Sequence, residues 1–382
     1  MNKADSELGV YVHWPYCARI CPYCDFNVFK NRKVDEKSWI DAFGKELEHW
    51  AEITGPRNLT SIYFGGGTPS LAPPDVINAV IEKCKALWGH SDNIEITLES
   101  NPTDVERDRF SKFHDAGVNR LSLGIQSLND EALKFLGRDH NASEGMKALD
   151  VAQSTFENVS IDLIYALPEQ TLDQWRNELQ TAMGAGVGHL SLYQLTIEEG
   201  TAFAKAVKQG RWTPTASDNA ADMFELTQQV TAAVGLPAYE ISNHATPGQE
   251  SKHNQIYWRY ADYVGIGPGA HGRISVDGRK FASETIRYPA AYLSSVIERG
   301  NGAEEFYALS REDELYERFA MGLRTNAGIT LYADDIFYED EERVVRLNSL
   351  VNDGYLANNC GRLTATDQGL RILDTIIFEV FR

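Results

Sequence analysis

The sequence predicts an α/β protein built on a partial (β/α)6 barrel, followed by a smaller C-terminal α+β domain of winged-helix-like shape. Three observations lead to this fold class. Six short β-branched and apolar runs occur between residues 10 and 196, helix-compatible stretches separate them, and polar or glycine residues mark their carboxyl ends. Such alternation is typical of parallel strands joined by right-handed crossovers. An open doubly wound sheet is the alternative, and it would also place its ligand beyond the strand ends.

The six expected strands follow one another through the first half of the chain. They are VYVHW at 10–14, SIYF at 61–64, IEITLES at 94–100, RLSLGIQS at 120–127, NVSIDLIYALP at 158–168 and HLSLYQLT at 189–196. In barrels of this type the site lies at the rim formed by the carboxyl ends of the strands. We therefore expect functional residues directly after these runs.

The pattern changes after about residue 200, and we expect three segments in all. We expect residues 1–240 to form the core barrel and residues 306–382 to form the helical winged-helix-like domain. Residues 241–305 are expected to be a loop-rich region that binds ligand and connects these two parts. In the last segment, RVVRLNSLVNDGYL reads as a helix and LANNCGRLTATDQG as a hairpin. The acidity of this domain argues against DNA binding, so we expect it to cover the barrel or to serve in docking.

Composition limits the classes of function. The chain has 382 residues, 43% of them hydrophobic, and a net charge of -19, which repels nucleic acid and anionic lipid at long range. No apolar run approaches the roughly 20 residues that cross a bilayer. Five cysteines, three of them within eight positions and Cys84 and Cys360 isolated, are no disulfide framework, and the N-terminal MNKADSELG lacks the apolar stretch of a signal peptide. We expect a cytoplasmic protein that does not bind nucleic acid.

Three of the cysteines stand together as CxxxCxxC, at Cys17, Cys21 and Cys24, directly after the first expected strand. A structural zinc site closes with four protein ligands, whereas a cubane iron–sulfur cluster held by three thiolates leaves one iron open to another molecule. A zinc site completed by His13, or chance clustering of buried thiols, is the alternative. Aromatic residues and prolines in the same loop favour a shielded redox centre.

Further polar and glycine residues mark the same rim. GGGTP at 65–69 follows SIYF, and its glycines would let backbone N–H groups approach a small anionic group such as a carboxylate. It matches neither the phosphate loop nor the dinucleotide fingerprint. Glu99, Gln126 and Asp162 follow three later strands, and several strands that each present one polar group to one face form a typical barrel site.

These motifs, CxxxCxxC, GGGTP, LESNP, GIQS and DLIYALP in this order, resemble the radical S-adenosylmethionine (SAM) enzymes over roughly residues 8–240. The resemblance implies that Cys17, Cys21 and Cys24 hold a [4Fe-4S] cluster whose open iron is chelated by SAM. Carried over position by position, it implies a SAM pocket that is lined by Tyr11, Gly66, Gly67, Thr68, Glu99, Gln126, Arg138 and Asp162.

A narrower resemblance is to the oxygen-independent coproporphyrinogen III oxidase group, and within it to the HemW-type haem chaperones. The signature HNxxYW of that branch is present as His253, Asn254, Tyr257 and Trp258, which implies haem binding by these residues. A neutral imidazole can ligate haem iron, and His271 in GIGPGAHG is a second candidate. The oxidase has a further cysteine where this chain has Phe26, and it has a longer N-terminal extension.

The sequence therefore predicts a haem chaperone that transfers haem to acceptor haemoproteins, respiratory-chain proteins among them, on a radical SAM scaffold. Coproporphyrinogen III oxidation, or radical chemistry on an unrelated substrate, is the alternative. Whether SAM is cleaved, and so whether the chain is an enzyme in that sense, stays open. Peripheral membrane contact through a local patch and a homodimer also stay open.

Overall fold

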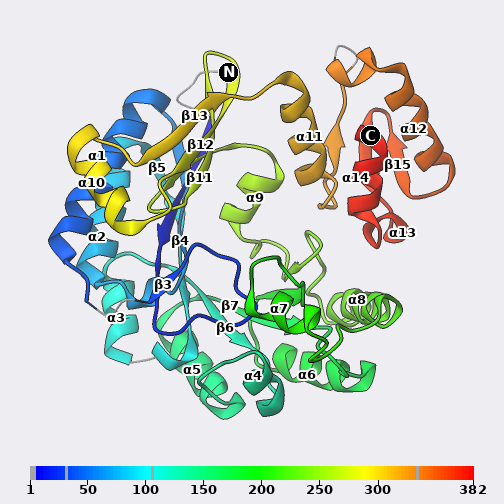
Figure 1. Ribbon diagram of the computed structural model, residues 1–382, viewed down its shortest axis with the longest axis horizontal. Helices are drawn as coiled ribbons and strands as arrows, with labels where there is room; N and C mark the ends of the chain where they lie inside the picture. The colour runs from blue at the N-terminus through cyan, green and yellow to red at the C-terminus, as the bar shows by residue number, and fades with distance from the viewer. Residues whose placement is uncertain (1–5, 31–32, 105–106, 333–334) are drawn as a thin grey trace.

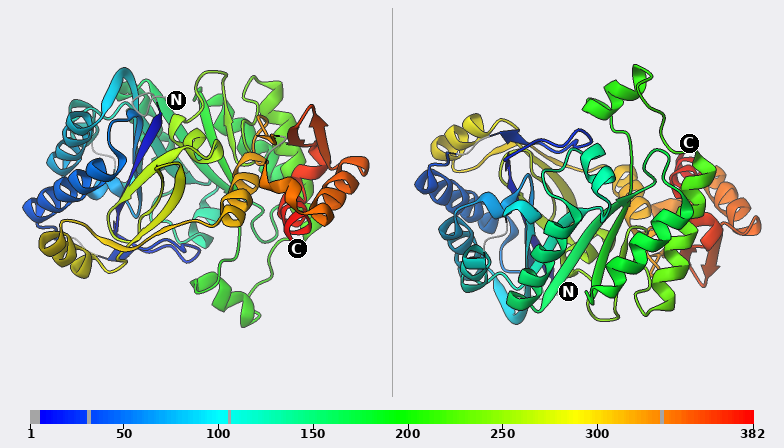
Figure 2. Two further views of the ribbon diagram at one scale, coloured as in Figure 1. Left: turned by 90° about the horizontal axis from the view of Figure 1, so that it is seen from above. Right: turned by 90° about the horizontal axis from the view of Figure 1, so that it is seen from below.

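The computed structural model describes residues 6–30, 33–104, 107–332 and 335–382. Its centre is one large, mostly parallel sheet that curves into a partial barrel with helices along its outer face (Figure 1). The two other views show the C-terminal domain at one end of this barrel (Figure 2). No helix in the described ranges combines the length and the apolar character that a membrane crossing requires.

All six strands expected from the sequence are present and parallel, which confirms the predicted fold class. They are β1 (Glu7–Trp14), β4 (Asn58–Gly66), β5 (Gly89–Ser100), β6 (Arg120–Gln126), β7 (Asn158–Tyr165) and β8 (His189–Gln194), and they are adjacent in this order. Val10, Ile62 and Leu98 are among the apolar side chains that fill the core between this sheet and the helices. The carboxyl ends of these strands therefore meet at one rim, as the sequence predicts.

The sheet continues on both sides of these six strands. β10 (Asp262–Ile266) pairs parallel with β1, and β11 (His271–Val276), β12 (Arg279–Thr285) and β13 (Ala303–Ala308) follow antiparallel. At the other edge, β9 (Asn243–Ala245) pairs antiparallel with β8. Within the described ranges the two edge strands, β13 and β9, are not paired with each other, so the barrel is open.

Residues 241–305 are thus more regular than the loop-rich region we expect. Besides β9 to β12 and the start of β13, they contain α9 (Lys252–Trp258) and α10 (Pro289–Arg299). The division of the chain at residues 240 and 305 stays a prediction. Strands from beyond residue 240 nevertheless belong to the same sheet as the predicted core.

Helices cover the outside of the sheet. They are α1 (Glu36–Thr54), α2 (Pro74–Leu87), α3 (Arg107–Asp115), α4 (Asp130–Phe135), α5 (Ala142–Thr155), α6 (Leu172–Gly184) and α8 (Ser217–Ala233). The short helix α7 (Ala202–Lys208) instead lies beside the thiol loop, where the Phe203 N–H donates to Pro22 O over 2.9 Å. Sequence signals fix two of their starts, because Asn141 with Glu144 and Thr171 with Gln174 form capping boxes. Buried tryptophans such as Trp39 and Trp175 anchor α1 and α6 to the core.

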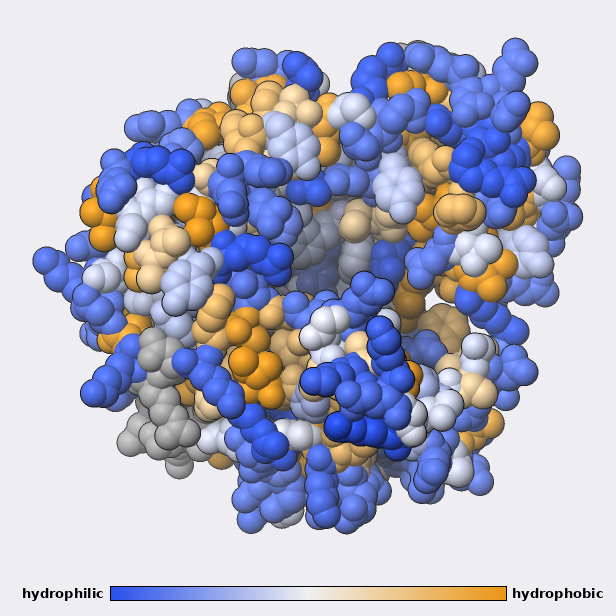
Figure 3. Space-filling model, viewed as in Figure 1, coloured by the Kyte–Doolittle hydropathy of each residue, from blue (hydrophilic) through white to orange (hydrophobic). Residues whose placement is uncertain are grey.

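The C-terminal domain has a hydrophobic core of its own. It comprises α11 (Arg311–Gly322), β14 (Ile329–Thr330), α12 (Glu341–Asn352), β15 (Leu356–Asn359), β16 (Arg362–Ala365), α13 (Asp367–Leu370) and α14 (Leu373–Phe381). Phe319, Phe337 and Leu363 are fully buried in its core. β15 and β16 form the expected hairpin, and β14 adds to it as a third antiparallel strand. Between this domain and the barrel the surface is hollowed near the centre of the molecule (Figure 3).

Candidate functional site

The three clustered cysteines lie in a loop that two short strands close. β2 (Tyr16–Cys17) pairs in parallel with β3 (Phe29–Lys30), so Cys21 and Cys24 lie in the turn between them. All three are free thiols and line one cavity of about 390 Å³, which we call the thiol cavity. The same cavity is lined by seven of the eight residues expected around SAM, namely Gly66, Gly67, Thr68, Glu99, Gln126, Arg138 and Asp162.

Hydrogen-bond donors point at two of the thiols. Arg138 Nη1 donates to Cys21 Sγ over 3.2 Å, and Thr68 Oγ1 donates to Cys17 Sγ over 3.5 Å. Burial, together with the neighbouring Cys17 and Cys21, raises the pKa of the Cys24 thiol to about 11. Thiolates at this place therefore need positive charge, which iron supplies. A three-thiolate cluster fits these residues.

Burial and a close pair of carboxyls give the rest of the thiol cavity a preference for cations. Tyr63 donates to Glu99 Oε1 over 2.8 Å, and Ser122 donates to Asp162 over 3.0 Å. Burial raises the pKa of Glu99 to about 7 despite the Tyr63 hydrogen bond, with a further contribution from Asp162. Burial also raises the pKa of Asp162. A cationic ligand would favour the ionised forms of both, and SAM carries an amino group and a sulfonium.

Two backbone amides of the GGGTP turn have partners within the protein. The Gly67 N–H donates to Trp14 O over 2.7 Å and the Thr68 N–H to Tyr16 O over 2.9 Å, so these two amides hold the thiol loop and do not face a carboxylate. A Cβ at position 67 would lie 2.7 Å from Tyr16 O. Glycine is therefore required here for the close approach of the thiol loop to β4.

His13, the fourth ligand that a zinc site would need, is already engaged within the protein. His13 Nδ1 lies 3.2 Å from the Tyr11 hydroxyl and His13 Nε2 lies 2.9 Å from Asn27 O, so both ring nitrogens have partners in the protein. Among the described residues, no three His, Cys, Asp or Glu side chains are grouped to hold a single metal ion. Thiolates around a cubane are spaced more widely than ligands of one ion, so the cluster interpretation is unaffected.

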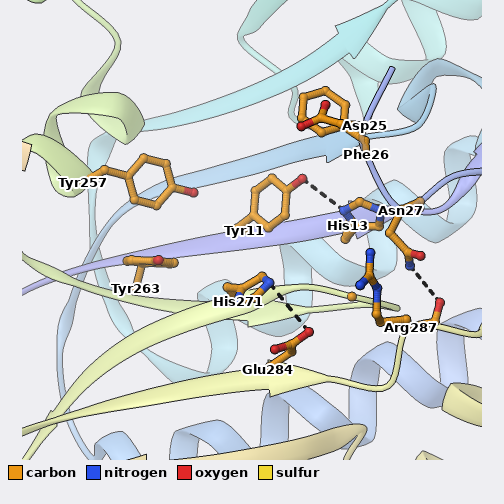
Figure 4. A pocket seen from close by; sticks show the side chains of 11 residues that line it. Tyr11, His13, Asp25, Phe26, Asn27, Tyr257, Tyr263, His271, Glu284 and Arg287 are labelled. Atoms are coloured by element: carbon orange, nitrogen blue, oxygen red, sulfur yellow. Dashed lines mark hydrogen bonds and ion pairs between the residues drawn. The ribbon is translucent and has the colours of Figure 1, made fainter. Parts of the chain in front are cut away.

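Tyr11, the eighth residue expected around SAM, lines a neighbouring cavity of about 450 Å³, which we call the His271 cavity (Figure 4). Its walls come from β1, the thiol loop, α9 and β10 to β12. They consist of Tyr11, His13, Asp25, Phe26, Asn27, Tyr257, Tyr263, Gly269, His271, Glu284 and Arg287. Asp25 and Phe26 also line the thiol cavity, so the two cavities are adjacent.

The HNxxYW residues form α9, which packs against β1, β4 and β10. His253 is 1% exposed, with Nδ1 2.7 Å from Ser61 Oγ and Nε2 2.7 Å from the Tyr257 hydroxyl. Its ring stacks on Tyr63 at 4.9 Å, and burial lowers its pKa to about 3. His253 is therefore a neutral imidazole, as expected, but both nitrogens are in use. Iron ligation by His253 stays a prediction, and it would require the ligating nitrogen to give up its present hydrogen bond.

The other members of the signature face in different directions. Tyr257 lines the His271 cavity, and Asn254 Nδ2 donates to the Tyr239 hydroxyl over 3.4 Å. Trp258 lies beneath Arg324 of the C-terminal domain, with the guanidinium carbon 5.1 Å from the ring centroid. The Glu95 carboxylate accepts hydrogen bonds from the His253 and Lys252 N–H groups and so caps the start of α9. The four residues do not form one ligand-binding surface.

Sequence reasoning missed several residues of the thiol cavity. Tyr23, Asn101 and Tyr193 line it, and Asn101 Nδ2 donates to Thr68 Oγ1 over 3.0 Å. Asn101 stands in the LESNP motif and could have been found there. Gln126 has a φ of 72°, a left-handed conformation that is uncommon for a residue other than glycine and that is concentrated at functional sites.

With the fold and the thiol cavity described, the chain can be compared with known proteins. Residues 11–182 match the profile of the Radical SAM superfamily. A relative from Mus musculus, "Radical S-adenosyl methionine domain-containing protein 1, mitochondrial", is 37% identical, over 99% of this chain and 88% of its own length. The chain belongs to the radical SAM superfamily. This membership implies a [4Fe-4S] cluster and SAM as cofactors.

The comparisons also define the group within the superfamily. "Heme chaperone HemW" from Haemophilus influenzae is 34% identical, over 98% of this chain and 97% of its own length. The solved structure of coproporphyrinogen III oxidase (HemN) from Escherichia coli shares the fold, with a TM-score of 0.81 at 22% identity, over 99% of this chain and 90% of that one. This chain is thus a radical SAM protein of the HemW/HemN-like group.

Proposed function

We propose that this chain is a haem chaperone, which binds haem beside a [4Fe-4S] cluster and SAM and transfers it to acceptor haemoproteins. The observation that carries the proposal is the second cavity: an open, aromatic-walled cavity adjoins the thiol cavity and includes Tyr257 of the HNxxYW signature. Relatives that align over nearly the whole chain are named haem chaperones, which supports the same conclusion.

In this proposal Cys17, Cys21 and Cys24 hold the cluster, and SAM binds at its open iron. Arg138 and Thr68 stabilise the cysteine sulfurs through the hydrogen bonds described above. Glu99 and Asp162 would receive the sulfonium and the N–H groups of SAM, and Gly66, Gln126 and Arg138 would complete the pocket. When bound, the cluster and SAM supply the capacity for one-electron chemistry at this rim.

Haem transfer can be tested directly. Wild-type protein is reconstituted anaerobically with iron and sulfide, titrated with haem, and then mixed with an apo-haemoprotein whose spectrum reports haem uptake. We expect haem to bind stoichiometrically and to move to the acceptor, and Cys21→Ala to lose the cluster. Cys360→Ala is the matched control, because Cys360 is exposed and lies in the C-terminal domain. Absence of haem binding by the reconstituted wild type would refute the proposal.

Coproporphyrinogen III oxidation is the second candidate, because the fold of the chain matches that of HemN. Phe26 stands where the oxidase pattern has a cysteine, and it is an apolar side chain that is 62% exposed. An anaerobic assay with coproporphyrinogen III, SAM and a reductant distinguishes the candidates. Decarboxylated product well above that of the Cys21→Ala protein would favour the oxidase. SAM turnover without haem binding or this product would favour an unrelated substrate.

The partners and the compartment stay predictions. An acidic chain of net charge -19 suits basic acceptors, and respiratory-chain proteins with a local membrane contact remain our expectation. The cytoplasm is predicted from the sequence, while the relatives include both bacterial proteins and a protein named as mitochondrial. Size-exclusion chromatography of cluster-loaded and cluster-free protein would test for the homodimer.

A further inference from the structure

The His271 cavity is built from parts of the chain that lie far apart in sequence. Tyr11 comes from β1 and Phe26 from the thiol loop, whereas His271 and Arg287 come from β11 and from the loop that follows β12. A hydrogen bond from Asn27 Nδ2 to Arg287 O, 2.7 Å long, joins the two sides. At about 450 Å³ its volume lies within the range of small-molecule sites.

His271 is the histidine of this cavity that is accessible to a ligand. Its side chain is 57% exposed, and Nε2 lies 3.9 Å from Glu284 Oε1, its direct partner across the β11–β12 pair. At 3.9 Å this contact is longer than a hydrogen bond, so Glu284 lies beside the ring without occupying its nitrogen. His253, by contrast, is buried with both nitrogens bonded.

The remaining walls suit a flat, largely apolar ligand with acidic groups. Tyr257 and Tyr263 meet edge to face at 4.6 Å and, with Tyr11, form an aromatic wall, while Phe26 exposes its ring at the boundary with the thiol cavity. Arg287 is exposed, and its guanidinium points toward His13 and Asn27, on the same side of the cavity as the thiol loop (Figure 4). Guanidinium groups pair well with carboxylates.

We propose that haem binds in the His271 cavity, with His271 as an axial ligand of the iron and Arg287 paired with a propionate. This inference rests on the proposed function and gives it a location. Tyr257 forms part of the macrocycle surface, and His253 is a positioning residue that holds the Tyr257 hydroxyl through its Nε2. The HNxxYW signature then contributes to haem binding through Tyr257, without iron ligation by its histidine.

The first test compares His271→Ala with a control, His90→Ala. His90 is exposed and lies at the N-terminal end of β5, away from the rim. Reconstituted proteins are titrated anaerobically with haem, and difference spectra and electron paramagnetic resonance report the iron ligands. We expect His271→Ala to weaken haem binding by roughly 10-fold or more and to change the ligand signature. His271→Gly should regain the wild-type ligand signature when imidazole is added, while His90→Ala should behave as the wild type.

The second test addresses the propionate. Arg287→Ala should weaken haem binding by roughly 10-fold, while the dimethyl ester of haem should bind equally to the variant and to the wild type. Arg279→Ala, an exposed arginine at the far end of β12, is the control. Equal haem affinity of Arg287→Ala and the wild type would overturn the propionate assignment.

The outcomes separate this inference from the proposed function. Haem binding by the wild type together with an unchanged spectrum and affinity in His271→Ala would overturn the location and leave the chaperone function in place. A wild type that binds no haem would remove both. Loss of the ligand signature in His253→Gln, with normal haem binding by His271→Ala, would identify His253 as the ligand of the haem iron and refute this inference.

Discussion

Replacing His253 by alanine tests whether this residue holds α9 on the barrel. The change removes the two 2.7 Å hydrogen bonds to Ser61 and Tyr257 and leaves both hydroxyl groups without the imidazole. A buried polar group that loses its partner costs about 1–3 kcal/mol, so the two together predict a loss of about 2–6 kcal/mol. For a chain of this length this corresponds to a melting temperature lower by roughly 3–8 °C.

The pH dependence of the free energy of unfolding tests the same role of His253 independently. Burial lowers the pKa of His253 from 6.5 to about 3, so below 6.5 the unfolded chain binds a proton at this residue that the folded chain does not. The stabilising contribution of the neutral ring is therefore complete above pH 6.5 and declines as the pH falls toward 3. At about pH 5 the decline amounts to roughly 2 kcal/mol.

The assay is thermal unfolding of cluster-free wild type, His253→Ala and His114→Ala between about pH 5 and 8, followed by circular dichroism. His114 is exposed, with a side chain 56% accessible, and its replacement should leave the melting temperature within about 1 °C of the wild type. We expect the difference between wild type and His253→Ala to shrink as the pH falls. An unchanged melting temperature in His253→Ala, or a difference that grows in acid, would refute the structural role assigned to His253.

Three further predictions concern the thiol cavity. Cys21→Ala should abolish bound iron and sulfide, measured by chemical analysis after reconstitution, and Cys360→Ala should retain both. Glu99→Gln should weaken SAM binding by roughly 10-fold in calorimetry. Because the pKa of Glu99 is about 7, the affinity of the wild type for SAM should also fall as the pH drops below 7. The variant should lack this pH dependence. Gly67→Ala should cost about 1–3 kcal/mol in urea unfolding, since its Cβ would meet backbone oxygens, whereas Gly44→Ala in open space on α1 should stabilise by up to about 1 kcal/mol.

The sequence was most informative where local pattern and final structure agree. β1, β4, β5, β6, β7 and β8 were all predictable, because each is an apolar run flanked by turn residues and each pairs with its neighbour in the chain order. Glu99, Gln126 and Asp162 of the thiol cavity were predictable for the same reason, because they follow those strands and the topology brings the strand ends to one rim. Arg138 follows α4 and was expected only from the family resemblance.

The second half of the sheet was not predictable in this way. β10 is the short run DYVGI, preceded by the polar SKHNQIYWRYA and followed by a glycine turn, and its strand conformation depends on pairing with β1, about 250 residues earlier. The partner of His253 was hidden for the same reason, because Ser61 lies on β4 and no local signal connects the two residues. Tyr11 lines the His271 cavity, and which of two adjacent cavities a residue of β1 lines depends on side-chain direction.

The two cavities differ in how much of the chain must be made before each can exist. The lining of the thiol cavity extends from Cys17 to Glu198, whereas that of the His271 cavity extends from Tyr11 to Arg287. Chains emerge from the ribosome N-terminal end first, and contacts between distant residues form late. During synthesis, the last residue that lines the thiol cavity therefore emerges about 90 residues before the last residue of the second cavity, and the second cavity depends on contacts that form later.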